Sequence, residues 1–169
     1  MAQKIIYQNP STGNLSIITA SPRKDISDLT HLVPAGVAYE IVEDSIIPTD
    51  RDFRNSWTAN NIGITTAATT VTEDITKAKV IHQDKIRIAR KKKFKELDIE
   101  FQKAQETNAS TAEIVDKKQV LRDAPAAAGI ATAANTTELK AQWDTSILGT
   151  SPYSKITVLK KNYGIKTPS

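Results

Sequence analysis

The residues with the clearest chemical potential form a basic run, RIARKKKFK, at positions 87–95. Positive charge of this density could displace counterions from nucleic-acid phosphates or meet an acidic protein surface. No groove-reading motif and no stacking aromatics accompany it. We therefore expect a solvated helical face, neutralised by a neighbouring chain or by Glu96 and Asp98, with nucleic-acid binding as the less favoured alternative. The candidate partner contacts in this run are Arg87, Arg90, Lys91, Lys92, Lys93 and Phe94.

Two further aromatic residues, Phe53 and Trp57, follow a run in which acidic and apolar residues alternate. Aromatic side chains are enriched at protein interfaces, so both rings, with Arg54 between them, are candidate partner contacts. The alternative is that both rings pack against the chain's own sheet. The general bias of aromatic residues toward burial favours this alternative.

The sequence contains no recognisable catalytic pattern. Its six glycines form no phosphate-binding loop, and no HExxH motif occurs. Cysteine is absent, which excludes disulfides and thiolate metal sites. His31 and His82 are the two histidines, and a metal would need carboxylates recruited around them. We expect no catalytic residue, no metal site and no cofactor, and therefore a protein that is not an enzyme.

Length and composition are typical of one folded domain or two small ones, with 169 residues of which 39% are apolar. The net charge of +4 is unevenly placed. Between Lys77 and Lys95, nine Lys or Arg residues accompany a single acid, Asp84. Such asymmetry favours an acidic partner surface. No apolar run is long enough for a signal peptide or a membrane span, so we expect a soluble protein without membrane contact.

The stretch 73–107 predicts one long helix, because it holds many strong helix formers and no Gly or Pro. Its second half places apolar residues at steps of three and four, which is one stripe of a helix. These residues are Phe94, Leu97, Phe101 and Ala104. We interpret the stripe as an interface or a core, and we include Leu97 and Phe101 among the candidate partner contacts.

The first fifty residues predict a small antiparallel sheet. Short β-branched runs at 4–7 and 15–19 flank a turn, and 37–42 alternates as a third strand. A short helical segment is expected at 26–31. Three such strands bury little surface alone, so we expect a helix, a second copy or another protein to cover them.

Composition changes twice between this sheet and the long helix. Residues 43–54 favour an extended arm. Residues 58–72, uncharged and rich in Thr and Ala, favour a linker or an extended segment ordered only against a partner, and their β-branched Ile62, Ile64 and Val71 also allow strand-like packing. We therefore divide the chain into four parts. They are a β-rich attachment domain at 1–57, the linker at 58–72, a helical domain at 73–149 and a basic tail at 150–169.

Two capping signals place further helices after the long one. The first, at 110–113, predicts a capping box for a helix at 111–122 that folds back as a helical hairpin. The Ala-rich stretch 124–134 favours a connector. The second signal, at 135–138, begins a short third helix that ends before Gly149. With a lone strand expected at 155–159, the predicted class is α+β.

Four segments of the chain resemble a family of small proteins that tailed bacteriophages encode in their tail and tail-fibre region. The segments read VPAGVAYEIVEDSIIPTDRDFRNSW, KAKVIHQDKIRIAR, LDIEFQKAQET and KKQVLRDAP. The resemblance spans residues 4–143 and is most specific at 33–39, 50–57 and 119–125. The last piece is also similar to the LRD-x-P signature of phage tail-assembly chaperones. The tryptophan-rich segment that precedes this signature in the chaperones is missing here.

The resemblance implies a non-enzymatic structural component of a bacteriophage tail, near the fibres or the baseplate, that acts by protein–protein attachment. Its partners would be other tail or tail-fibre proteins, and it would be an oligomer or part of a symmetric assembly. It would lie in the virion tail, and in the host cytoplasm during assembly. The alternative is a tail-fibre assembly chaperone that is not retained in the virion.

Overall fold

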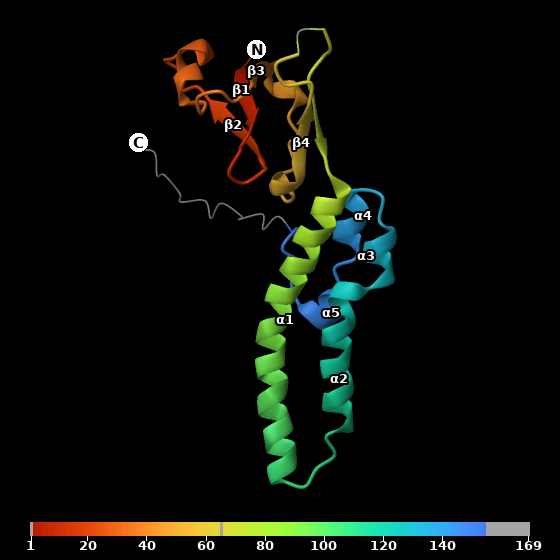
Figure 1. Cartoon of the computed structure of the whole chain (residues 1–169). Coiled ribbons are helices and arrows are strands. Elements are labelled where there is room, and N and C mark those ends of the chain that lie inside the picture. The colour runs from red at the N-terminus through yellow and green to blue at the C-terminus, as the bar shows by residue number, and fades with distance from the viewer. Residues whose placement is uncertain (1, 65, 155–169) are drawn as a thin grey trace, which may run out of the picture.

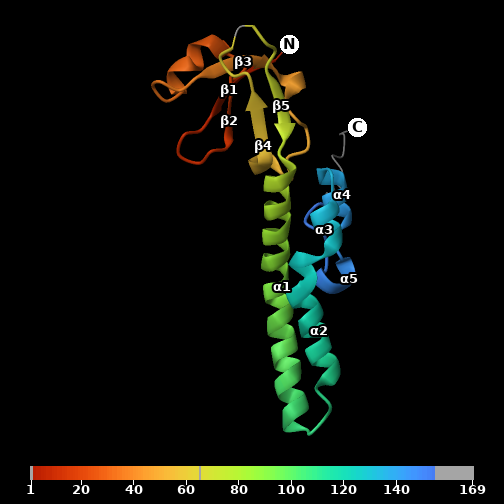
Figure 2. The same ribbon diagram turned by 45° about the vertical axis from the view of Figure 1, so that its right-hand side comes forward.

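The chain folds into a β-rich head and a long helical stalk that projects from it (Figures 1 and 2). The computed structural model describes residues 2–64 and 66–154. The head comprises the described residues up to Glu73, and the stalk begins at Asp74. One helix, α1 (Ile75–Glu106), leaves the head and runs the length of the stalk, and the later helices lie along one side of it. The predicted α+β class is confirmed.

Three antiparallel strands form the first sheet of the head, in the order β2, β1, β3. They are β1 (Gln3–Gln8), β2 (Leu15–Thr19) and β3 (Tyr39–Glu43). In the turn between β1 and β2, the amide of Asn9 donates to Asn14 O at 2.9 Å. Gly13 in the same turn has a φ of 68°, which suits a residue without Cβ. The three predicted strands are confirmed.

The chain itself covers both faces of this sheet. On one face Ile6 packs with Trp57, which follows the sheet in sequence. On the other face Ile5 packs with Leu29, which belongs to a 3₁₀ helix, Ile26–Leu32. The predicted short helical segment is therefore present as 3₁₀ helix, and it supplies part of the cover that a three-stranded sheet needs.

The segment predicted as a linker, 58–72, takes part in a second sheet. Strand β4 (Trp57–Asn60) pairs antiparallel with β5 (Thr70–Glu73), and Trp57 lies opposite Glu73 in the ladder. The linker prediction is wrong because the β-branched Thr and Val residues at the two ends of this segment favour strands and pair once their register is fixed. The buried Trp57 ring provides that anchor.

The predicted extended arm at 43–54 is a folded connection. It contains a 3₁₀ turn, Asp44–Ile46, and leads into a second turn, Arg54–Ser56. Ile47 is buried against the first sheet, whereas Phe53 is buried in the core of the stalk. The prediction of an extended arm is wrong because Ile47 packs into the core of the head while Phe53 packs into the core of the stalk.

The predicted long helix is confirmed, and both of its ends are capped. The carboxylate of Asp74 accepts hydrogen bonds from two first-turn amides at 2.9 and 3.1 Å, which satisfies two otherwise free donors. At the other end, Asn108 has a φ of 52°, and the amide of Ala109 donates to Ala104 O at 2.8 Å. This left-handed termination is the Schellman motif.

Helix α2 (Ala112–Asp123) folds back along α1, so the predicted helical hairpin is confirmed. The capping box at its start is not formed. Ser110 Oγ accepts from the amide of Ala112 at 3.4 Å, and Thr111 is the residue at the cap position. Because the helix begins one residue later than predicted, Glu113 is no longer at the position from which it could reach back to the cap.

After α2 ends before Pro125, as predicted, three short helices follow along α1. They are α3 (Ala128–Thr132), α4 (Thr136–Ala141) and α5 (Thr145–Leu148). Helix α3 lies in the predicted connector, 124–134. The cap at Asn135 is confirmed, since the amide of Glu138 donates to its side chain at 2.9 Å. The predicted third helix is divided in two, because Asp144 caps a new helix. The predicted strand at 155–159 lies outside the described residues.

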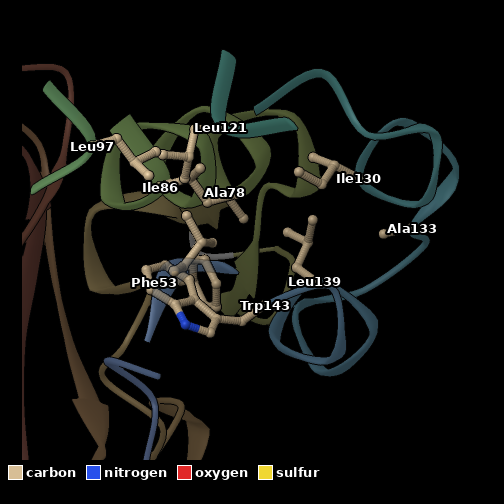
Figure 3. Close-up of a cluster of buried hydrophobic side chains, with 10 residues drawn as sticks. Phe53, Ala78, Ile86, Leu97, Leu121, Ile130, Ala133, Leu139 and Trp143 are labelled. Carbon is tan, nitrogen blue, oxygen red and sulfur yellow. The ribbon is translucent and has the colours of Figure 1, made fainter. Parts of the chain in front are cut away.

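One buried apolar cluster joins the stalk helices to each other and to the head (Figure 3). Phe53 enters it from the head, next to the Trp143 ring. Its members are Phe53, Ala78, Ile86, Leu97, Leu121, Ile130, Ala133, Leu139, Trp143 and Leu148. Because the cluster contains residues of both parts, the head and the upper stalk are packed as one unit.

Candidate protein-binding surface on the stalk

The basic run at 87–95 lies on α1, and its cations fall into two groups. The first group is held by the chain itself. The guanidinium of Arg87 donates to the Asp84 carboxylate at 2.7 Å, and the ammonium of Lys93 donates to Glu96 at 3.0 Å. These are local pairs three residues apart, so both cations are partly neutralised within the helix.

Arg90 also belongs to the held group. Its guanidinium donates to the backbone oxygens of Leu121 and Arg122, at 3.1 and 3.0 Å. Carbonyl groups at a helix C-terminus carry partial negative charge, and here they belong to the last turns of α2. Arg90 therefore fastens α2 to α1, and its role as a partner contact stays a prediction.

The second group is free on the surface. Lys91, Lys92 and Lys95 are exposed, and no ion pair links them to another described residue. Ile88 and Ile99 lie beside them on the side of α1 opposite Leu97, with 67% and 54% of their surface exposed. We call these five residues the outer face of α1. It retains the candidate contacts Lys91 and Lys92, adds Ile88 and Lys95 from the same basic run, and adds Ile99 beyond the run.

The apolar stripe of α1 belongs to the core of the chain. Leu97 is 9% exposed and Phe94 packs partly buried against the same cluster. The Phe101 ring is also partly buried, and the Lys118 ammonium of α2 lies 4.5 Å from its centroid. Of the two readings of the stripe, a core is therefore the one that the structure supports.

Phe53 and Trp57 are buried as well, at 1% and 0% exposure. The alternative of packing against the chain's own sheet is confirmed for Trp57 and is wrong for Phe53, which is buried in the core of the stalk. Neither ring is available to a partner in this structure. Arg54 between them remains exposed. The attachment role predicted for residues 1–57 stays a prediction, without these two rings as its anchors.

An open groove of about 490 Å³ lies between α1, α2 and α5, and the sequence did not predict it. Its apolar floor is formed by Leu97, Val120, Leu121 and Ile147, and its charged rim by Lys93, Glu96, Glu100, Glu113, Asp116 and Lys117. We call the cavity lined by these residues the groove. They come from three helices, so no single stretch of sequence carries the signal.

The rim of the groove has net negative charge. Its two lysines are already paired, one with Glu96 at 3.0 Å and the other with Glu113 at 2.7 Å. Glu100 and Asp116 form no ion pair with another described residue. Two carboxylates beside an apolar floor suit a ligand that is basic and partly apolar.

A buried polar cluster at the top of α1 was also missed by the sequence. His82 is fully buried, its Nδ1 lies 2.7 Å from Tyr153 Oη, and the two rings stack with centroids 5.7 Å apart. Burial, and to a lesser degree the charge of Lys85, lowers the pKa of His82 to about 4. His82 is therefore neutral near pH 7. Its Nε2 has no hydrogen-bond partner in the part of the chain that the structure describes.

An ion cluster lies beside this histidine. The ammonium of Lys140 in α4 binds the carboxylates of Asp50 and Asp52. Burial by itself would lower the pKa of Lys140, but the hydrogen bonds and charges of both carboxylates outweigh it and raise that pKa. The ammonium of Lys85 donates to Asp52 O at 2.8 Å. These contacts tie the stalk to the head.

The chain matches no described protein family, no curated protein and no solved structure. None of the helices in the described ranges combines the length and apolar character that a bilayer crossing needs. Over the same residues, no three His, Asp or Glu side chains gather closely enough to hold a metal ion. The outer face and the groove are therefore the features from which a function can be inferred.

Proposed function

We propose that this protein is a non-enzymatic structural component of a bacteriophage tail, in the tail-fibre or baseplate region, that acts by protein–protein attachment. The observation that carries the proposal is the outer face of α1. A single exposed isoleucine is ordinary on a protein surface, whereas two among three exposed lysines on one helix make a mixed contact surface. Its partners are acidic, partly apolar surfaces of other tail proteins.

The tail setting is supported by the resemblance of four segments of the chain to small tail-region proteins of bacteriophages. The absence of catalytic work is supported by the buried polar groups. His82 is hydrogen-bonded to Tyr153, and Lys140 is bound by two carboxylates. Neither His82 nor Lys140 lines the groove. We therefore assign these buried polar groups to the packing of the stalk against the head.

The chaperone alternative draws on the similarity of 119–125 to the LRD-x-P signature. Leu121 and Pro125 of this segment are both buried, and the side-chain amide of Gln83 donates to Pro125 O at 3.0 Å. The segment packs where the chain turns from α2 into α3. Leu121 and Pro125 of the signature are therefore committed to the core of the chain itself, which favours the structural role.

The nucleic-acid alternative draws on the same lysines as the main proposal. Binding to single strands would also need rings on which bases could stack. The Phe94 ring packs partly buried against the core, and it is the aromatic residue of the basic run. Protein attachment is therefore favoured. Salt-dependent retention on DNA that is lost when Lys91, Lys92 and Lys95 are changed to Gln would reverse this preference.

A peptide inventory of purified particles tests the proposal. Particles of the phage that encodes this chain are purified and separated into heads and tails, and the peptides of each fraction are quantified by mass spectrometry. A structural component is found in the tail fraction, in constant ratio to the other tail proteins. A chaperone is abundant in infected cells and missing from particles, and that result would overturn the proposal.

A further inference from the structure

Two surfaces of the stalk have complementary properties, and neither is satisfied by the described part of the chain. The outer face carries the ammonium groups of Lys91, Lys92 and Lys95 beside two exposed isoleucines. The groove carries the unpaired carboxylates of Glu100 and Asp116 beside an apolar floor. One surface is basic, and the other is an acidic groove.

The two surfaces cannot meet within one chain. Ile88 and Lys95 of the outer face lie on the side of α1 opposite Leu97, which forms part of the groove floor. A single rigid helix separates them, so contact between them requires two molecules. A second copy of the chain is the partner that is certain to be present wherever the first is made.

The charge and shape of the surfaces agree with this partner. In an approaching copy, Lys91 and Lys95 can meet Glu100 and Asp116, while an isoleucine of the outer face enters the groove against Val120, which is 46% exposed. Burial of exposed apolar side chains supplies affinity, and opposite charges on the rim select the register. Helix α1, with 32 residues, is about 48 Å long, which offers room for an extended contact along the stalk.

We propose that copies of this chain associate through their stalks, with the outer face of α1 in one copy seated on the groove of the next. The contact joins two different surfaces, so repetition of it closes a ring or extends a filament. The inference deepens the proposed function, since it makes the chain a self-associating subunit of the tail. Self-association is measured on the purified protein alone. A negative result would therefore leave the particle inventory as an independent test of the proposed function.

Charge reversal tests the contact. The outer-face variant carries Lys91→Glu and Lys95→Glu, and the groove variant carries Glu100→Lys and Asp116→Lys. A control matched to the outer-face variant carries Arg23→Glu and Lys24→Glu, which make the same change of net charge as that variant at exposed positions in the head. Molar mass is measured by sedimentation and light scattering up to about 200 µM protein, and circular dichroism verifies that each variant is folded.

The wild type and the head control are expected to self-associate, and added salt is expected to weaken the association. Each reversed variant alone is expected to associate at least about tenfold more weakly, because each then presents two surfaces of the same sign. A mixture of the two variants is expected to regain the wild-type molar mass. A monomeric wild type at the highest concentration would overturn the proposal, and so would variants that associate as the wild type does. A mixture that stays dissociated while both variants are folded would also overturn it.

Discussion

At the scale of single residues, the most unusual group is the buried histidine at the top of α1. His82 is enclosed by the Tyr153 ring on one side, with Trp143 edge-on at 6.2 Å. A neutral imidazole can be kept there, whereas an imidazolium would lose hydration and lie close to Lys85. The role of His82 is therefore to complete packing between α1 and the residues around Tyr153, at the cost of sensitivity to acid.

This arrangement predicts a loss of stability between pH 6.5 and pH 4. The pKa of His82 is lowered from 6.5 to about 4 by folding, so in this window the unfolded chain binds a proton that the folded chain does not. The stabilising contribution of neutral His82 is complete above pH 6.5 and is lost as the pH falls toward 4. A shift of this size corresponds to about 3 kcal/mol in the free energy of unfolding. Urea unfolding at pH 7 and at pH 4.5 measures it.

The variant with His82→Phe and Tyr153→Phe should lose most of this acid sensitivity, because it keeps two stacked rings and removes the buried base. His31, the other histidine, is exposed, so His31→Gln is the matched control and should preserve the wild-type difference between the two pH values. If the double variant and the wild type lost equal stability on acidification, His82 would not be the responsible group.

At the scale of elements, strong local patterns predicted the fold and weak ones did not. The long helix was predictable because residues 73–107 lack Gly and Pro, and the strands at 4–7 and 15–19 because β-branched residues flank a turn. Strand-like packing at 58–72 was predictable only as an alternative to a linker, because the register of the hairpin at 57–73 depends on the buried Trp57, which is a tertiary effect. The division of the third helix was missed because either Asn135 or Asp144 can cap a helix.

The sequence predicted which residue types make up the candidate surface, but it did not predict which of those residues contact one another. The sequence identified the basic run, yet only contacts across the stalk separate Arg90, which binds α2, from Lys91, which is free. The groove is assembled from α1, α2 and α5, and the contact between His82 and Tyr153 spans 71 positions. Patterns within a window of a few residues carry no information on such pairs.

The apolar stripe of α1 makes a prediction at this scale. Leu97→Ala should lower the free energy of unfolding by about 2 to 4 kcal/mol, because Leu97 is buried in the core of the stalk and its loss leaves a cavity. The same substitution at Leu32, which is 52% exposed, should cost less than about 1 kcal/mol. Thermal and urea unfolding measure both variants. Equal effects at the two leucines would mean that the stripe faces solvent.

At the scale of the whole molecule, the ion cluster around Lys140 holds the head against the stalk. Lys140→Met would leave Asp50 and Asp52 beside each other without their shared cation. The expected cost is about 1 to 2 kcal/mol at pH 7. The hydrogen bond from Lys140 lowers the pKa of Asp50, so the stabilisation is present above the usual Asp pKa of 3.8 and is lost as the pH falls below it. Urea unfolding should show a smaller cost at pH 3 than at pH 7.

The exposed Lys103 on α1 provides the matched control for this cluster. Lys103→Met should change the free energy of unfolding by less than about 0.5 kcal/mol at either pH. A Lys140→Met variant as stable as this control at pH 7 would show that the cluster does not contribute to the join between head and stalk.

Lysine footprinting on intact tails tests the central claim most directly, namely that this chain is a tail component attached through the outer face of α1. Purified protein, diluted to a concentration at which it is monomeric, and purified tails are acetylated under identical conditions, and each lysine is quantified by mass spectrometry. Lys91, Lys92 and Lys95 should react readily in the free protein and at least about fivefold less in tails, since a contact excludes the reagent. Lys24, exposed in the head, serves as the internal reference. Tails in which the peptides of this chain are absent, or in which the three lysines react as fast as in the free protein, would contradict the claim.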